Sequence, residues 1–147
     1  MTSNAQDMPD AVQDEMNAAF NAVMVAAESV LSDGTELYPF AAHIDDDGAI
    51  EPIYPAEDTW VGSTMGQLLD SLYARVVSVA SGSRVAAIAT DVEFDGGEGV
   101  RVELEHCDGY AIMIVVPYVR EEGSTTVQFQ MDDMMALDGI RRVWPAA

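Results

Sequence analysis

The fold is decided by residues 85–119, which read VAAIATDVEFDGGEGVRVELEHCDGYAIMIVVPYV. Three runs rich in Val, Ile and aromatic residues, at 85–94, 100–107 and 110–119, are separated by a glycine-rich turn and by Asp108-Gly109. Such residues favour strands, and connections this short join neighbouring antiparallel strands. The stretch therefore predicts a meander of three strands.

Two helices and a hairpin precede this meander. Residues 10–32 place apolar side chains at helical spacing, and Gly34 ends the pattern. A second helix begins at the capping box Thr64-x-x-Gln67 and runs toward Gly82. Between the helices, residues 37–44 and 49–54 read as two strands joined by an Asp-Gly turn. A last strand is expected at 125–131.

The order of these elements predicts an α+β domain, α-β-β-α-β-β-β, with room for a short C-terminal helix. We expect an antiparallel sheet of about five to six strands, with the two main helices packed on one face. Residues 1–8 are predicted to form a flexible N-terminus, and residues 9–147 a single domain.

The charge balance is unusual, because 26 acidic residues face six basic ones and give a net charge of -20. All six basic residues are arginine. Nucleic acids and anionic membranes are bound through clustered Lys and Arg, so neither is an expected partner. Two explanations of the acidity stay open. It either keeps the surface hydrated in high salt or forms one acidic face for a basic partner.

A cytoplasmic location is expected from three observations. The first ten residues show no basic segment followed by an apolar one, as a signal peptide would. The longest apolar run, at 111–116, is far shorter than the ~20 residues that span a bilayer. Cys107 is the single cysteine, which excludes an intrachain disulfide and fits a reducing compartment.

The turn at Asp108-Gly109 suggests how the protein assembles. A two-residue turn would pair Cys107 with Tyr110 and place Leu104 opposite Met113 on the inner face of the sheet. The outer face would then carry three aligned aliphatic side chains, Ile112, Ile114 and Val116. Either a second copy covers this row, which makes it a homodimer interface, or another part of the same chain does.

No set of residues predicts catalysis or a cofactor. His106 and Cys107 are adjacent and would point to opposite sides of a strand, so an inert thiol is favoured over a nucleophile. His43, Asp45 and Asp47 could ligate a divalent metal, but their spacing is typical of a solvated turn, and no metal site is expected. Side chains that could line a pocket between sheet and helices are Tyr38, Trp60, Tyr73 and His106.

Three functions remain open on the sequence alone. The leading hypothesis is a non-catalytic interaction or regulatory module that is its own partner as a homodimer, with another protein as a further partner. The second is an inhibitor or immunity-type protein whose acidic surface blocks a basic partner. The third is an enzyme or small-molecule-binding domain with a pocket between the sheet and the helices.

Overall fold

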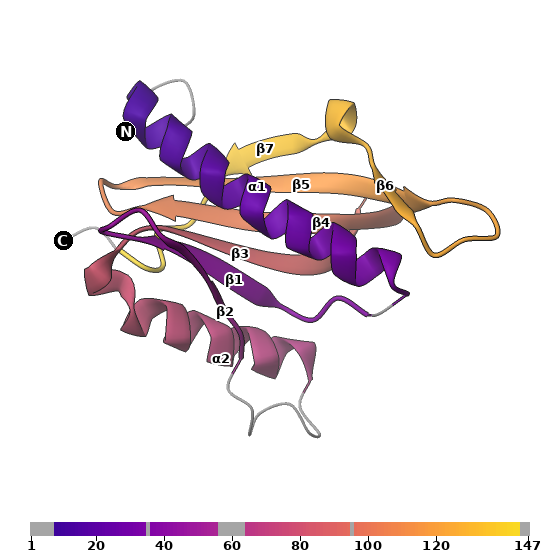
Figure 1. Cartoon of the computed structure of the whole chain (residues 1–147), viewed down its shortest axis with the longest axis horizontal. Coiled ribbons are helices and arrows are strands. Elements are labelled where there is room, and N and C mark those ends of the chain that lie inside the picture. Colours follow the sequence, from indigo (N-terminus) through magenta and orange to yellow (C-terminus); the bar gives the residue numbers. More distant parts are fainter. Residues whose placement is uncertain (1–7, 35, 56–63, 95, 145–147) are drawn as a thin grey trace.

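The fold is an antiparallel sheet with one long helix on each face (Figure 1). A computed structural model describes residues 8–34, 36–55, 64–94 and 96–144. Within these residues the elements are α1 (Asp10–Ser32), β1 (Phe40–Asp45), β2 (Ile50–Ile53), α2 (Met65–Ser78), η3 (Ala80–Gly82), β3 (Ser83–Phe94), β4 (Gly97–His106), β5 (Tyr110–Arg120), β6 (Val127–Phe129), η4 (Met131–Asp133) and β7 (Met135–Asp138). The predicted α+β class and the order of its main elements are confirmed.

The strands lie in the order β2-β1-β3-β4-β5, and β6 and β7 both pair with the outer side of β5. All pairings are antiparallel. Strand β7 lies in the C-terminal segment, for which the sequence allowed a short helix. The tail that follows it, at 139–144, is not helical. The 3-10 turn η4 is the only helical structure after β6 in the described residues.

Helix α1 covers one face of the sheet. Its buried side chains include Phe20, Val23 and Leu31, which pack with Val102 and other apolar residues of the strands. Met8, which precedes the helix, is buried in the same core. This cluster is the larger of the two apolar cores.

Helix α2 packs on the opposite face of the sheet. The prediction that both helices pack on one face is therefore wrong. Its capping box is present as expected, because Thr64 Oγ1 accepts the Gln67 N–H at 3.1 Å and Gln67 Oε1 accepts the Thr64 N–H at 2.9 Å. Leu72 and Val76 pack against Ala41 and neighbouring strand residues. β1 and β3 are apolar on both faces, so both faces need a cover.

The turn between β4 and β5 contains three residues, not the predicted two. His106 pairs with Tyr110, and Gly109 closes the turn with a φ of 101° and an N–H that donates to the His106 carbonyl. The Cys107 N–H donates instead to the Arg84 carbonyl on β3. The predicted register is therefore wrong by one residue, and Leu104 lies opposite Ile112 rather than Met113.

This shift moves the expected dimer interface into the core. Ile112 and Val116 are buried under α1, and Ile114 packs against the same cluster. Because neighbouring side chains on a strand alternate between faces, Met113 and Val115 are the β5 side chains on the α2 side of the sheet. Strand β5 is apolar on both faces, as the sequence indicated. The side chains on each face are the reverse of those expected.

Candidate functional site

Three of the four predicted pocket residues lie in the described part of the chain, at separate places in the fold. Tyr38 lines a shallow cavity of about 220 Å³ between α1 and β1, together with Tyr54. Tyr73 lies on α2, and His106 is fully buried on the α1 face of the sheet. Trp60 lies outside the described residues. Tyr73 and His106 therefore lie on opposite faces of the sheet.

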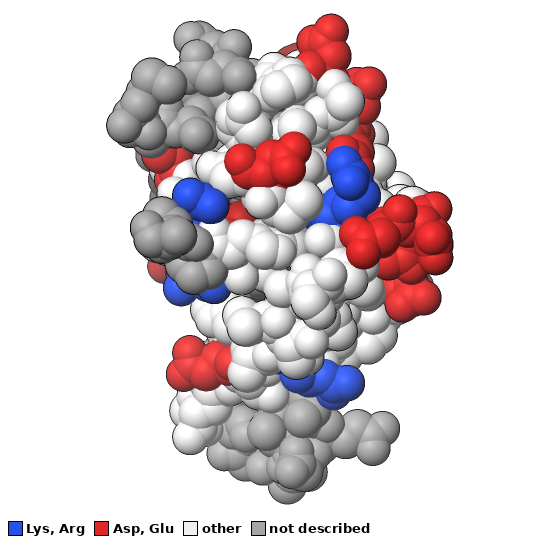
Figure 2. Space-filling model, turned by 90° about the vertical axis from the view of Figure 1, so that its left-hand side faces the viewer, with Lys and Arg blue, Asp and Glu red and all other residues white. Residues whose placement is uncertain are grey.

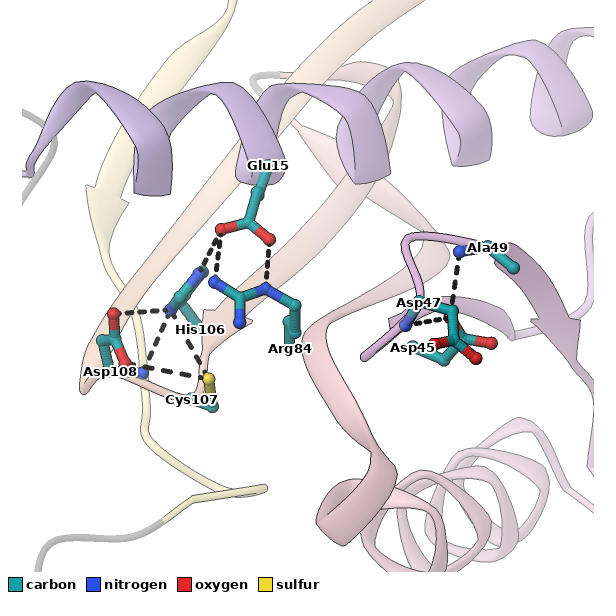
Figure 3. Close-up of polar contacts among 8 residues, drawn as sticks. All are labelled: Glu15, Asp45, Asp47, Ala49, Arg84, His106, Cys107 and Asp108. Carbon is teal, nitrogen blue, oxygen red and sulfur yellow. Dashed lines mark hydrogen bonds and ion pairs between the residues drawn. The ribbon is translucent and has the colours of Figure 1, made fainter.

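A partly buried polar cluster lies where the β4–β5 turn meets α1 (Figure 3). His106 Nε2 lies 3.2 Å from Glu15 Oε1, and Arg84 donates to both carboxylate oxygens of Glu15 through Nε and Nη2. The hydrogen bonds from Arg84, with a smaller contribution from His106, hold the pKa of Glu15 down at about 2, although burial opposes this. Glu15 is therefore charged at neutral pH.

The hydrogen bonds of His106 define its tautomer. Nδ1 accepts the backbone N–H of Asp108 at 3.0 Å, so this nitrogen carries no proton. Nε2 is then the protonated nitrogen and donates to Glu15. Both ring nitrogens of His106 therefore form hydrogen bonds within the protein. The arrangement positions the turn against α1.

Cys107 lies closer to His106 than strand alternation implied, because it belongs to the turn. Its Sγ is 3.9 Å from His106 Nδ1 and 3.8 Å from Asp108 Oδ1. Burial, and then the charge of Asp108, raise the pKa of the thiol. His106, Cys107 and Asp108 are the one group of potential metal donors gathered in the described part of the chain. Nδ1 already accepts a hydrogen bond and the sulfur is a neutral thiol. The geometry therefore fits a structural role for this turn better than a metal site or a reactive thiol.

The acid-rich turn between β1 and β2 is held by its own hydrogen bonds. Asp45 Oδ1 accepts the N–H groups of Asp47 and Ala49, both at 2.9 Å (Figure 3). His43 Nδ1 lies 2.7 Å from the Ser83 hydroxyl. The His43 and Asp45 side chains are thus engaged in contacts that hold the turn. These contacts do not bring His43, Asp45 and Asp47 together around a common point.

A second polar network holds the C-terminal tail against β4. The Glu105 carboxylate is buried and accepts the backbone N–H groups of Arg142, Val143 and Trp144, at distances of 2.6–2.9 Å. Three donors on one carboxylate satisfy a charge that would otherwise be costly to bury. The Glu105 side chain on β4 is therefore an anchor for the tail.

Glu103 forms the other half of this network. It accepts hydrogen bonds from the Tyr73 hydroxyl and from Arg142 Nε and Nη2. The Arg142 guanidinium also lies 4.2 Å from the centre of the Tyr73 ring. Burial and the hydrogen bond to Glu103 raise the pKa of Tyr73 to about 12. Helix α2, strand β4 and the tail are thereby joined.

An exposed apolar surface follows the β5–β7 edge. Helix α2 covers the β1–β3 half of the sheet face on which it packs, and the tail lies against β4, whereas β7 is exposed along its whole length. Met135, Leu137 and Ile140 are 45%, 45% and 65% exposed. Together with the half-buried Met113 and the buried Val115 beside them, these three exposed side chains form the β5–β7 apolar strip.

Acidic side chains do not merge into one patch on the face that Figure 2 shows. They lie in separate groups, with a few basic side chains and uncharged surface between them. Among the described residues, no helix combines the length and apolar character needed to cross a bilayer.

The chain matches no protein-family model, no curated protein and no solved structure.

Proposed function

We propose that this protein is a non-catalytic interaction module that associates with a second copy of itself through the β5–β7 apolar strip. The observation that carries the proposal is the exposure of Met135, Leu137 and Ile140 on one sheet edge of a chain with a net charge of -20. Contiguous apolar surface of this kind marks contact sites more often than isolated exposed residues do.

The strand edge itself supports pairing between copies. In the described part of the chain β7 pairs with β5 alone, so its other edge presents unpaired backbone groups. The opposite edge of the sheet, β2, carries Glu51 and Pro52, which discourage strand addition. β7 reads Met-Ala-Leu-Asp and has no proline and no basic residue. Its protection as an edge is limited to its short length and to Asp138.

Two copies of β7 are compatible with antiparallel pairing about a two-fold axis. Pairing centred on Leu137 would place this residue opposite its counterpart in the other copy, and Asp138 of one copy opposite Ala136 of the other. The two carboxylates would then not face each other, and the same surface would be used by both copies, as in most homodimers. The strips of the two copies would then lie side by side on the α2 side of the joined sheets.

Salt should favour the association, because two chains of charge -20 repel each other over a distance set by ionic strength. Raising the salt from about 0.1 M to about 1 M shortens the screening length from ~10 Å to ~3 Å and strengthens apolar contact. Light scattering after size exclusion should give a dimer mass in high salt and a larger monomer fraction in low salt.

Leu137→Asp should give a monomer in high salt, because it places a charge in the strip. Val77→Asp is the matched control, since Val77 is an exposed aliphatic on α2 at 47% exposure and the change adds the same charge. A monomer mass for the unmodified chain at every salt concentration would overturn the proposal. Equal dissociation of both variants would show that charge, and not the strip, is responsible.

A further inference from the structure

A cavity of about 340 Å³ lies between the start of α2, the segment before β1, and the paired ends of β3 and β4. Its polar lining includes Thr90 and Arg101, which are register partners on the α2 side of the sheet. Leu37 and Leu69 contribute apolar lining from the other elements. The volume fits a small organic molecule.

Thr90 contributes a buried hydroxyl that the fold does not use. Its side chain is 6% exposed, and Oγ1 has no hydrogen-bond partner in the described structure. Nε of Arg101 is likewise buried without a partner. A buried polar atom without a partner costs free energy that folding normally avoids. Two such donors on adjacent strands, both lining one cavity, indicate a ligand that accepts hydrogen bonds from them.

The first turn of α2 adds donors to the same cavity. The capping box satisfies the Gln67 N–H, which leaves the N–H groups of Met65 and Gly66 without a partner within the helix. Both residues line the cavity, and Gly66 has no side chain to obstruct its N–H. These groups lie at the positive end of the helix dipole. The donors around the cavity therefore suit an anionic group.

The charges nearby limit how strongly negative that group can be. Nη2 of Arg101 lies 3.9 Å from Glu103, which partly neutralises it. Glu36 and Asp91 also line the cavity, and Asp91 Oδ1 accepts a hydrogen bond from the Tyr118 hydroxyl. The cavity therefore offers no net positive charge, and an anion would be held by the hydrogen-bond donors. A singly charged carboxylate matches this balance better than a phosphate that carries nearly two negative charges.

We propose that this cavity binds a small organic monocarboxylate. The carboxylate accepts hydrogen bonds from the Thr90 hydroxyl, from Arg101 Nε and from the first-turn N–H groups of α2. The apolar body of the ligand lies against Leu37 and Leu69. This binding is independent of the self-association proposed above, since Leu37, Leu69 and the helix start are not part of the β5–β7 apolar strip.

Titration followed by amide NMR tests the proposal on the full chain at fixed ionic strength. Benzoate and isobutyrate are the probes, benzamide is the uncharged counterpart, and inorganic phosphate tests the charge argument. We expect saturable shifts of the Met65 and Gly66 amide signals with a carboxylate and no saturation with benzamide. No saturable response to either carboxylate, an equal response to benzamide, or saturation by phosphate alone would overturn the proposal.

Variants separate a binding role from a structural one. Thr90→Val keeps the side-chain shape and removes the unpaired hydroxyl, so it should leave the unfolding midpoint unchanged or raise it while weakening carboxylate binding about tenfold. Arg101→Gln should weaken binding similarly. Arg75→Gln removes the same charge at the other end of α2 and should bind as the unmodified chain does. Unchanged binding in Thr90→Val and Arg101→Gln, or equal weakening in Arg75→Gln, would contradict the assignment.

Discussion

Glu15 and Arg84 are 69 positions apart in the chain, yet two hydrogen bonds join the carboxylate on α1 to the guanidinium on β3. Glu15 also accepts from His106, so one helix residue holds both the start of β3 and the end of β4. The contact fixes the first half of α1 over this end of the sheet. It has consequences for stability that can be measured.

Glu15→Gln should destabilise the protein and remove part of its sensitivity to acid. The pKa of Glu15 is about 2 in the folded protein and 4.5 ordinarily, so its contribution is complete above pH 4.5 and is lost as the pH falls toward 2. We expect the free energy of unfolding at neutral pH to fall by about 1–2 kcal/mol, after allowance for partial exposure of the carboxylate.

Denaturant unfolding at neutral pH and between pH 4.5 and 2 measures both effects. Asp14→Asn is the control, because Asp14 is an exposed neighbour on the same helix. An acid dependence in Glu15→Gln as steep as that of the unmodified chain would contradict the role given to this carboxylate.

Glu105→Gln should loosen the C-terminal tail. The carboxylate accepts three backbone N–H groups at residues 142–144, and the amide retains only one oxygen to accept them. We expect a loss of about 1–3 kcal/mol in the free energy of unfolding and faster hydrogen exchange at these three amides. Glu121→Gln, at an exposed turn, should change neither. Unaltered exchange at residues 142–144 would show that the tail is held by other contacts.

Gly139→Ala should disturb the junction between β7 and the tail. A Cβ at this position would lie 2.6 Å from the Ile112 N and 2.8 Å from the Ala111 carbonyl carbon, both backbone atoms of β5. We expect a fall in the unfolding midpoint of several degrees, corresponding to about 2 kcal/mol or more. Gly82→Ala has open space around the new methyl group and should be neutral or slightly stabilising. Equal midpoints for the two variants would refute the steric argument.

Cys107 should react slowly with iodoacetamide in the native protein at neutral pH. Burial and the charge of Asp108 raise the pKa of the thiol, and only the thiolate attacks. Asp108→Asn should move the rate profile to lower pH, because it removes the nearby negative charge. The single cysteine makes the alkylation rate unambiguous. A native rate at neutral pH that equals the rate in denaturant would contradict the assignment of an inert thiol.

Local sequence signals predicted the elements well. Helix α1 was expected at 10–32 and spans Asp10–Ser32, because helical periodicity and the following glycine are local properties. The capping box of α2 was likewise read correctly from Thr64 and Gln67. Strand boundaries differ by a few residues, as they do for β1, which begins at Phe40 rather than at residue 37.

Features that depend on distant residues were not predictable from those signals. Asp-Gly favours a two-residue turn, but the Cys107 N–H donates to Arg84 on another strand, and a three-residue turn results. That single extra residue reversed the assignment of Ile112 and Met113 to the two faces of β5. The partners of Glu105 lie at residues 142–144, where no pattern in the sequence predicts an anchored tail.

Alternation along β4 also restricts where the length of the chain can vary. Val102 and Leu104 face α1, whereas Glu103 and Glu105 face α2 and the tail. One residue inserted within 101–105 would send the acids into the apolar core and the aliphatic side chains toward the tail. The exposed turn at 121–124 carries no such constraint. Insertions and deletions in relatives of this chain should therefore occur in that turn and spare β4.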